Sequence, residues 1–572
     1  MHQHNATRSL DGTGPTTEPR DRQGRLRRFG HVARPGPDTR ERLVPPFPEP
    51  AVRLRALTRL DPARVYPVAK AMDWVGPVLV AALAGAVRFW HLGRPRALVF
   101  DETYYAKDAW SLLRLGYEGT WPDRKIADPQ ILAHPRTIPL SDTGAFVAHP
   151  PTGKWVIALG EWMFGLDPFG WRFMTAALGT LSVLMLCRIG RRLFRSTPLG
   201  CLAGALLAVD GLHLVMSRNA LLDLVVMFFV LAAFGCLLID RDHARARLAA
   251  ALPVGADGRA RPDARTGDHA GTGARPWRPA AGLFLGLAAS TKWNGLYVLA
   301  FFVILTVLWD VGARRVAGAG RSYRAVLRKD LGWSVLSLVP VAATTYLVTW
   351  TGWFLSDKGY GRHWADGRGG TWSWVPAPLR SWWHYEYGVY QFNVGLHSPH
   401  AYESNPWSWL VLGRPVLFHY ESPKSGRDGC HTAVDCSQTV LALGTPLLWW
   451  SACCALVYLL HRWALRRDWR AGAILCAVGA GLLPWFLYQD RTIFSFYAVV
   501  FVPYLCLAVT MMLGALSGPP GADRGRRTVG AVAAGVLVLL IAWNFVYFFP
   551  LYTGQTIPYA DWHSRMWLDT WI

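Results

Sequence analysis

The chain alternates long apolar runs with polar segments, and several of these runs are long enough to cross a lipid bilayer. The ranges 331–354 and 529–549 reach or exceed the roughly 20 residues that a membrane-spanning helix needs. Applied to the whole sequence, this criterion predicts an all-α polytopic membrane protein with about eleven spans, of which the fifth is short. The predicted spans are 72–90, 171–187, 199–216, 220–239, 280–293, 295–310, 331–354, 439–460, 471–488, 493–515 and 529–549.

The polar segments between the runs divide the chain into four parts. Residues 1–70 are rich in Arg, Gly and Pro and are predicted to be a disordered cytoplasmic tail. Residues 71–354 are predicted to form a catalytic transmembrane module that begins with a signal anchor. The range 355–438 is a large extracellular loop, and 439–572 holds the C-terminal transmembrane helices.

Two of the loops have distinctive sequences. The first extracellular loop, 91–170, holds two amphipathic stretches, 103–115 and 153–164, which are predicted to be helices lying along the membrane surface. The segment 242–279 has the Gly, Pro and Arg content of a flexible cytoplasmic loop.

The charge of the chain supports this topology. A net charge of +22 would suggest nucleic-acid binding in a soluble protein. Here the basic residues gather in the N-terminal tail and in segments that face the cytoplasm if the N-terminus is cytoplasmic. The loop 355–438 has seven Lys and Arg against seven Asp and Glu. The positive-inside rule therefore accounts for the charge, excludes a nucleic-acid partner, and places the C-terminus and both large loops outside the plasma membrane.

The composition of the loop 355–438 leaves two further questions open. Its many Trp, Tyr and His residues could bind sugar or peptide, yet aromatic residues also gather at any membrane interface. Cys430 and Cys436 are the two cysteines of this loop. They are predicted to form a small disulfide loop, with free thiols or a metal pair with His431 as the alternatives.

Adjacent carboxylates at Asp101 and Glu102 follow shortly after the first apolar run. Carboxylates beside a membrane are costly, so this pair is a candidate for catalysis or for an acidic helix start. A carboxylate can act as a base, and cations beside it can stabilise a phosphate group. Lys154, Arg172 and Lys292 near the outer ends of spans are candidate cations, with snorkelling to headgroups as the alternative.

Two further stretches carry candidate residues. His149 begins a proline-containing entry to the second amphipathic stretch. Arg218 and Asp223 stand in the turn between the third and fourth spans, where they could serve the site or pair with each other to cap a helix.

Common signatures of soluble enzymes are missing from the sequence. It has no Walker phosphate loop, no GxGxxG between a strand and a helix, no HExxH and no spaced CxxC pair. We therefore predict no metal and no cofactor, and we expect an activated substrate that is already in the membrane.

The chain resembles the protein O-mannosyltransferases, in particular their actinobacterial members. The resemblance rests on seven stretches that occur in order over most of the chain beyond residue 95. They are FDETYYAKDAW (100–110), HPPTGKW (149–155), GWRFMTAALG (170–179), SRNALLDLVVMFF (217–229), STKWNGLY (290–297), NPWSWLVLGRP (405–415) and DRTIFSFYAVVFVPY (490–504).

The resemblance implies a GT-C membrane glycosyltransferase with eleven spans. It implies transfer of mannose, with inversion, from polyprenyl-phosphate mannose to Ser or Thr of secreted proteins that emerge from the translocon. Asp101 and Glu102 match the family's acidic pair, Arg172 looks like its essential arginine and Lys292 like a ligand of the donor phosphate. Lys154 joins these two as a candidate phosphate ligand. The further site candidates in the matching stretches are His149, Arg218, Asp223, Trp407, Arg414 and Arg491.

One departure and two alternatives accompany this expectation. Eukaryotic members carry an MIR domain in the loop between the seventh and eighth spans, and 355–438 is too short to hold it. A related GT-C enzyme acting on a lipid or cell-wall glycan would have a similar membrane core. A transporter would instead need ionisable residues at midspan, whereas these residues stand mostly at span ends. Between the two carboxylates, the resemblance alone favours Asp101 as the base.

Overall fold

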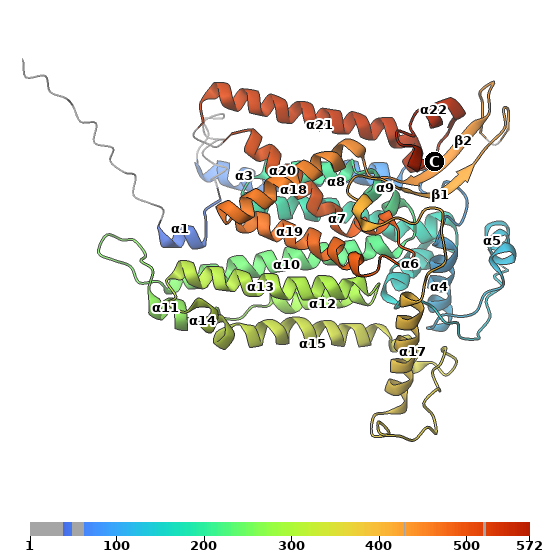
Figure 1. The fold of residues 1–572 in the computed structure, drawn as a ribbon, viewed down its shortest axis with the longest axis horizontal. Coiled ribbons are helices and arrows are strands. Elements are labelled where there is room, and N and C mark those ends of the chain that lie inside the picture. Colours follow the sequence, from blue (N-terminus) through green and yellow to red (C-terminus); the bar gives the residue numbers. More distant parts are fainter. Residues whose placement is uncertain (1–37, 48–61, 136, 428, 519–521) are drawn as a thin grey trace, which may run out of the picture. The chain divides into compact units, whose positions relative to one another are not determined.

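Long helices make up most of the unit Asp38–Ile572 (Figure 1). The computed structural model describes residues 38–47, 62–135, 137–427, 429–518 and 522–572. The α-helices are α1 (Thr39–Leu43), α3 (Pro62–Phe89), α4 (Glu102–Leu115), α5 (Arg124–Ala133), α6 (Thr152–Phe164), α7 (Pro168–Phe194), α8 (Thr197–Ala208), α9 (Gly211–Arg218), α10 (Leu222–Ala251), α11 (Ala264–His269), α12 (Trp277–Ala289), α13 (Asn294–Ala317), α14 (Ser322–Lys329), α15 (Leu331–Thr349), α16 (Thr351–Leu355), α17 (Ala377–Val394), α18 (Pro446–Arg466), α19 (Trp469–Leu482), α20 (Val502–Leu516), α21 (Arg524–Thr553) and α22 (Tyr559–His563). Short 3₁₀ helices are η1 (Pro406–Ser408), η2 (Leu483–Leu487), η3 (Ser495–Phe501) and η4 (Asp569–Trp571), and the strands are β1 (Val416–Glu421), β2 (Cys436–Ala442) and β3 (Thr556–Pro558).

The predicted spans coincide with helices in the structure. Within the described residues, six helices are long and apolar enough to cross a membrane: α7, α10, α13, α15, α19 with η2, and α21. The pair α8 and α9, bent by 63°, brings the number to seven if it forms one broken span. The other four predicted ranges fall on α3, α12, α18 and α20, which do not meet the same test. The protein is thus a mostly helical polytopic membrane protein, and the number eleven stays a prediction.

The structure contains a small sheet that was not predicted from the sequence. The order is β1-β2-β3, antiparallel throughout, and β2 pairs Ala442 with Val416 of β1. The predicted span 439–460 was therefore wrong at its start, because its first residues belong to β2 and α18 begins only at Pro446. A short apolar run cannot by itself distinguish a buried strand from the beginning of a helix.

Other boundaries also differ from the prediction. The two expected surface helices of the first large loop are present as α4 and α6, and α5 is an additional helix between them. Helix α10 continues to Ala251, and α11 lies within the segment expected to be a flexible loop. In the range 1–70, α1 and the first turns of α3 are helical, while residues 1–37 and 48–61 of the predicted tail lie outside the described residues.

Helix α10 forms the centre of the helical unit. Its most apolar window is 83% buried, against 17% for α21, which runs along one edge of the unit (Figure 1). Helices α7, α12 and α13 pack against α10. At one end of these long helices lie α4, α6, α17 and the sheet, and α11 and α14 lie at the other end (Figure 1). This arrangement brings the residues of both large loops to the same end of the helices.

Candidate active site

Asp101 stands at the start of α4, on a turn with an unusual backbone conformation. The preceding residue, Phe100, has a φ of 51°, which is uncommon for a bulky side chain. The Phe100 ring stacks on Phe418 of β1 with ring centroids 4.7 Å apart. Packing against the sheet thus holds a turn that would otherwise be strained, and this turn presents Asp101 at the helix start.

Glu102, the second carboxylate of the pair, is completely buried and fully hydrogen-bonded. Its Oε1 accepts from Arg172 Nε at 2.8 Å and from the Ala220 backbone N–H at 2.9 Å. Its Oε2 accepts from an Arg172 amino group at 2.7 Å and from the Val99 backbone N–H at 2.8 Å. Four donors satisfy the carboxylate, so Glu102 ties α4, α7 and the start of α10 together and keeps no free acceptor for a substrate proton.

Arg172 is equally occupied within the protein. Besides Glu102, its amino groups donate to the carbonyls of Pro95 at 2.9 Å, Ala97 at 2.8 Å and Leu92 at 3.3 Å. All five guanidinium N–H groups therefore have partners. The predicted role of Arg172 as a ligand of the donor phosphate does not fit this geometry, because no donor remains for an added anion.

Asp101 has a different environment from its neighbour. Burial and the nearby Asp223 carboxylate raise the pKa of Asp101 to about 6, while Lys292 and a hydrogen bond with Tyr105 act in the opposite direction. A carboxylate with such a pKa is ionised at neutral pH and is still a stronger base than an ordinary aspartate. Among the two adjacent carboxylates, Asp101 is the one that can accept a proton.

Lys292, at the turn between α12 and α13, is held beside Asp101 by Asp223. The Lys292 ammonium lies 3.0 Å from each oxygen of Asp223 at the start of α10. It also lies 4.1 Å from the centroid of the Tyr497 ring. Three helices thus fix one cation next to the candidate base.

The suggested pairing of Arg218 with Asp223 was wrong. Arg218 instead donates to the carbonyls of Arg88 at 2.9 Å and Trp90 at 2.6 Å, at the end of α3. Asn219 has an extended backbone, which turns the chain sharply between α9 and α10 and separates the two side chains. Arg218 therefore caps the C-terminal end of α3 and not that of α9, the helix to which it belongs.

A cationic pocket of about 180 Å³ opens beside Lys292. Arg491 donates to Asn393 Oδ1 at 3.2 Å, and its Nε has no hydrogen-bond partner among the described residues. Burial, Lys292, Lys154 and Arg491 hold the pKa of His149 well below its usual range, so this imidazole is neutral. The pocket is lined by Ala148, His149, Lys292, Trp293, Asn294, Leu296, Tyr297, Tyr390, Asn393, Val394, Pro484, Trp485, Tyr488 and Arg491. It offers two cations and aromatic walls, which suit a phosphate joined to a sugar.

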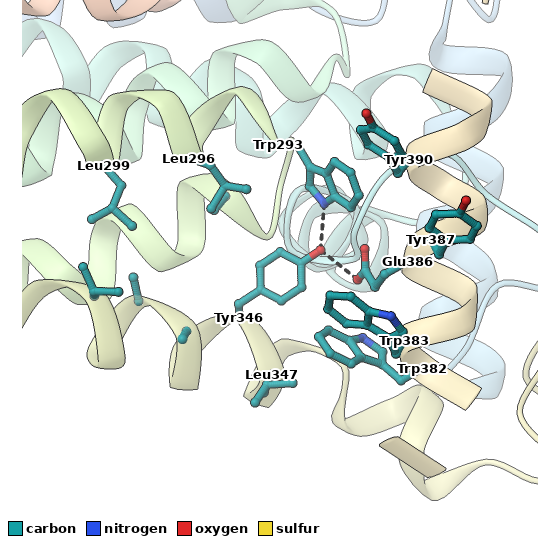
Figure 2. Close-up of a pocket in the computed structure, with 14 residues that line it drawn as sticks. Trp293, Leu296, Leu299, Tyr346, Leu347, Trp382, Trp383, Glu386, Tyr387 and Tyr390 are labelled. Atoms are coloured by element: carbon teal, nitrogen blue, oxygen red, sulfur yellow. Dashed lines mark hydrogen bonds between the residues drawn. The ribbon is translucent and has the colours of Figure 1, made fainter. Parts of the chain in front are cut away.

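An apolar groove of about 510 Å³ continues from this pocket between α13, α15 and α17 (Figure 2). The groove and the pocket share Trp293, Leu296 and Tyr390. The groove is lined by Ala289, Trp293, Leu296, Leu299, Val339, Ala342, Ala343, Tyr346, Leu347, Trp382, Trp383, Glu386, Tyr387 and Tyr390. A hydrocarbon chain could lie along it while its charged end reaches the cationic pocket.

Glu386 is the single carboxyl group that lines the groove. The Tyr346 hydroxyl donates to Glu386 at 2.8 Å and accepts from Trp293 Nε1 at 2.9 Å (Figure 2). Burial raises the pKa of Glu386 to about 7, against the lowering effect of the hydrogen bond from Tyr346. This chain of bonds holds α17 against α15 and the start of α13.

Lys154 belongs to a separate buried cluster. Its ammonium lies 2.5 Å from Glu118, 4.0 Å from Asp108 and 2.9 Å from the carbonyl oxygen of His149. The predicted contact of Lys154 with the donor phosphate does not fit, because the ammonium points into this cluster between α4 and α6. Its bond to the His149 carbonyl instead fixes the backbone at the edge of the cationic pocket.

The remaining candidates lie further from Asp101. Trp407 is 75% exposed and packs edge-on against Phe486. Arg414 donates to the carbonyls of Ala401, Thr570 and Ile572, so it anchors the C-terminus. Cys430 and Cys436 are joined, with the sulfur atoms 2.02 Å apart.

Metal binding has no evident location in the described part of the chain. No group of three or more His, Cys, Asp or Glu side chains there could hold a metal ion. The absence of a metal and of a cofactor from the chemistry stays a prediction.

Several residues of the candidate site were not predicted from the sequence. Tyr105 follows Asp101 by four residues, a spacing that places both on one face of α4 and could have revealed it. Asn294 and Tyr497 line the site as well, but no local pattern points to them.

The arrangement of helices matches that of a known class of membrane enzymes. The solved Saccharomyces cerevisiae protein O-mannosyltransferase Pmt1–Pmt2 complex, bound to the sugar donor, superimposes with a TM-score of 0.64. The match covers 88% of this chain and 93% of that chain at 14% sequence identity, so it shows a shared fold. The fold is that of a GT-C membrane glycosyltransferase.

Sequence comparison identifies the family. The description "Dolichyl-phosphate-mannose-protein mannosyltransferase" matches residues 78–251, and "C-terminal four TMM region of protein-O-mannosyltransferase" matches 378–571. A polyprenol-phosphate-mannose–protein mannosyltransferase of Mycolicibacterium smegmatis is 37% identical over 523 residues, which are 90% of this chain and 95% of the relative. A protein of that name from Mycobacterium tuberculosis is 36% identical over 536 residues, covering 91% and 97%. The chain belongs to the protein O-mannosyltransferase family, which confirms the resemblance found in the sequence.

Proposed function

We propose that this protein transfers mannose from polyprenyl-phosphate mannose to Ser and Thr hydroxyls of secreted proteins, with inversion at the anomeric carbon. Membership of the family and the names of its actinobacterial relatives support this assignment. The observation that carries it is the continuity of three features: a carboxylate base at Asp101, a cationic pocket and an apolar groove.

In the proposed reaction Asp101 accepts the proton of the acceptor hydroxyl. The hydroxyl oxygen forms a bond to the anomeric carbon while the bond from that carbon to the phosphate oxygen breaks on the opposite face. The electron pair of the broken bond leaves with the polyprenyl phosphate. Glu102 is excluded as the base because its four hydrogen bonds leave its carboxylate no free acceptor.

Lys292 and Arg491 are the proposed ligands of the donor phosphate. Both line the cationic pocket, and Arg491 retains an unpartnered Nε there. Stabilising the negative charge that develops on the leaving phosphate is typically the largest contribution to such catalysis. Arg172 and Lys154 become positioning residues, which hold Glu102 and the backbone of His149 in place.

The apolar groove is the proposed site of the polyprenyl chain. Its walls come from α13, α15 and α17, and its inner end meets the cationic pocket at Trp293. A lipid-linked donor would then keep its chain in a hydrocarbon environment while its phosphate reaches Lys292.

The orientation in the plasma membrane is also part of the proposal. The basic tail and basic loops would face the cytoplasm, so the end with α4, α17 and the C-terminus would face outside. Acceptor proteins would meet the site there as they leave the translocon. An outward-facing site has no access to cytosolic nucleotide sugars, which agrees with a lipid-linked donor.

Replacement of Asp101 tests the assignment. With purified enzyme, radiolabelled polyprenyl-phosphate mannose and a Ser/Thr-containing acceptor, we expect Asp101→Asn to lower the transfer rate about 10²- to 10⁴-fold. Asp142→Asn, which changes an exposed aspartate of the same loop, is the matched control. Equal rates for the wild type and the Asp101 variant would disprove the role of this residue.

The same assay distinguishes protein mannosylation from the main alternative, which is transfer to a lipid or a cell-wall glycan. Label that appears in protein supports protein mannosylation. Label that accumulates only in lipid or in cell-wall glycan would assign the enzyme to those acceptors instead.

A further inference from the structure

A second groove lies between α3, α7 and α10, away from the candidate active site. Its volume is about 470 Å³. Arg172 lies near the start of α7 beside Glu102, whereas Arg188 of this groove follows 16 residues later, roughly 24 Å along the helix axis. The groove is lined by Trp74, Leu184, Met185, Arg188, Ile189, Arg191, Arg192, Leu231, Ala232, Gly235, Cys236, Ile239 and Phe284.

The walls of this groove are apolar, and arginines gather at one end of it. Leu184, Leu231 and Phe284 contribute hydrocarbon and aromatic surface. Arg188 donates to the Asp73 backbone carbonyl at 3.0 Å, and its guanidinium lies 3.7 Å from the centroid of the Trp74 ring. These two contacts hold the Arg188 side chain within the groove and leave most of its N–H groups available.

The arginines at this end outnumber the carboxylates that pair with them. Asp73 pairs with Arg191, and Asp242 is shared by Arg192 at 2.8 Å, Arg195 at 3.3 Å and Arg241 at 3.1 Å. With Arg188, the described residues provide five guanidinium groups around two carboxylates, which leaves three positive charges in excess. An anion of one or two charges would therefore be attracted to this end of the groove.

We infer that this groove binds an anionic glycerophospholipid of the membrane. Its phosphate would accept hydrogen bonds from Arg188 and Arg192, and one acyl chain would lie between α7 and α10. Basic pockets between transmembrane helices bind anionic headgroups, because the phosphate is paired while the chain remains in an apolar environment. A soluble phosphate would use the arginines but would leave the apolar walls unfilled. The site is independent of the catalytic residues and of the proposed reaction.

Two variants test the two halves of this site. Arg188→Gln with Arg192→Gln removes two positive charges. Gly235→Leu adds a side chain to the groove without altering charge, and a Cβ at position 235 would lie 3.5 Å from Ile189, which is an ordinary van der Waals contact. Since glycine is a poor helix former, the latter variant is not expected to weaken α10. Arg466→Gln, at an exposed arginine near the end of α18, is the matched control.

Binding is measured on the purified full-length protein by native mass spectrometry with phosphatidylglycerol and with phosphatidylcholine of the same acyl chains. We expect preferential binding of phosphatidylglycerol, a loss of about fivefold in affinity for each arginine removed, and weakened binding in the Gly235 variant. The Arg466 variant should bind like the wild type.

Three outcomes would overturn the inference. The first is equal binding of the two lipids, and the second is equal binding by the wild type and the double arginine variant. The third is displacement of the lipid by soluble glycerol phosphate with no effect of Gly235→Leu, which would assign the arginines to a soluble phosphate instead.

Discussion

At the scale of single residues, the candidate site separates two adjacent carboxylates by their hydrogen bonds. Glu102 accepts four bonds and is a structural anchor, whereas Asp101 has a raised pKa and a neighbouring cation. The chemical difference between these two side chains is one methylene group. Their roles are set by the groups that the fold places around each of them.

The pH dependence of transfer tests the state of Asp101. Because only the ionised carboxylate accepts a proton, we expect kcat/KM to rise with pH through an apparent pKa near 6. Asp223→Asn removes a negative charge that raises the pKa of Asp101. The rise of kcat/KM with pH should therefore occur at lower pH in this variant, even though its transfer rate is lower than that of the wild type. The profiles of the two enzymes are compared in the same buffers. An unshifted rise of kcat/KM would mean that Asp223 does not act on the base.

Arg172 tests the distinction between a positioning residue and a phosphate ligand. Arg172→Lys cannot reproduce the bidentate pairing with Glu102, and breaking a buried pair costs about 3–5 kcal/mol. We expect a lower melting temperature and a lower kcat, with little change in the KM for the donor. Lys292→Met should also lower kcat, because this cation is proposed to stabilise the leaving phosphate, but unlike the Arg172 variant it should in addition raise the donor KM. A raised donor KM in the Arg172 variant alone would restore the phosphate-binding role.

At the scale of elements, α4 and α6 are joined by a buried polar cluster that holds the edge of the site. Lys154 of α6 lies between Glu118 and Asp108, and burial together with Glu118 raises the pKa of Asp108 to about 7. Glu161, also of α6, is buried with neither oxygen hydrogen-bonded in the described structure. Burial and the nearby Asp108 carboxylate raise its pKa well above the usual range.

These two residues of α6 should respond oppositely to replacement. Lys154→Met leaves Glu118 buried without its cation and should destabilise the protein by about 3–5 kcal/mol. Glu161→Met removes a carboxyl group that has no partner, so its effect on stability should be neutral or favourable. Thermal unfolding of both variants in the same detergent provides the measurement. Equal destabilisation by both would contradict the ion-pair interpretation.

At the scale of the whole molecule, helices from distant parts of the chain line the groove and the pocket that we propose as the path of the lipid donor to Asp101. The apolar groove takes its walls from α13, α15 and α17, the cationic pocket adds residues near η2, and Asp101 comes from the first large loop. A lipid donor would use the whole path. A bulky side chain in the groove should therefore weaken the binding of donors with a long lipid chain more than the binding of donors with a short one.

A tryptophan in the groove tests this use of the path. Ala343 lines the groove and is exposed, and Ala343→Trp should raise the KM for a long-chain polyprenyl donor severalfold while a short-chain donor is little affected. Thr344→Trp, at the next position of α15 and outside the groove lining, is the matched control. Equal effects of the two variants would remove the groove from the donor path.

The sequence by itself determined the class of the protein and most of its helices, and it indicated the segment around Asp101 as a candidate site. The length of an apolar run and the distribution of charge between runs are properties of the sequence itself. They do not depend on how the membrane helices pack against one another. Seven ordered stretches were enough to predict the family. The ends of elements were less certain, and the strand β2 was mistaken for part of a helix because both are apolar.

Only the tertiary structure decided what each charged side chain does. Arg172 lies 70 residues from Glu102, and Ala220 lies 118 residues from it, yet these contacts satisfy the Glu102 carboxylate and leave Asp101 as the proposed base. The Lys154 ammonium pairs with Glu118 and is not directed at the predicted phosphate. Asp223 pairs with Lys292 and not with Arg218. The energy of a buried charge depends on the partners that surround it, and those partners come together only when distant helices pack.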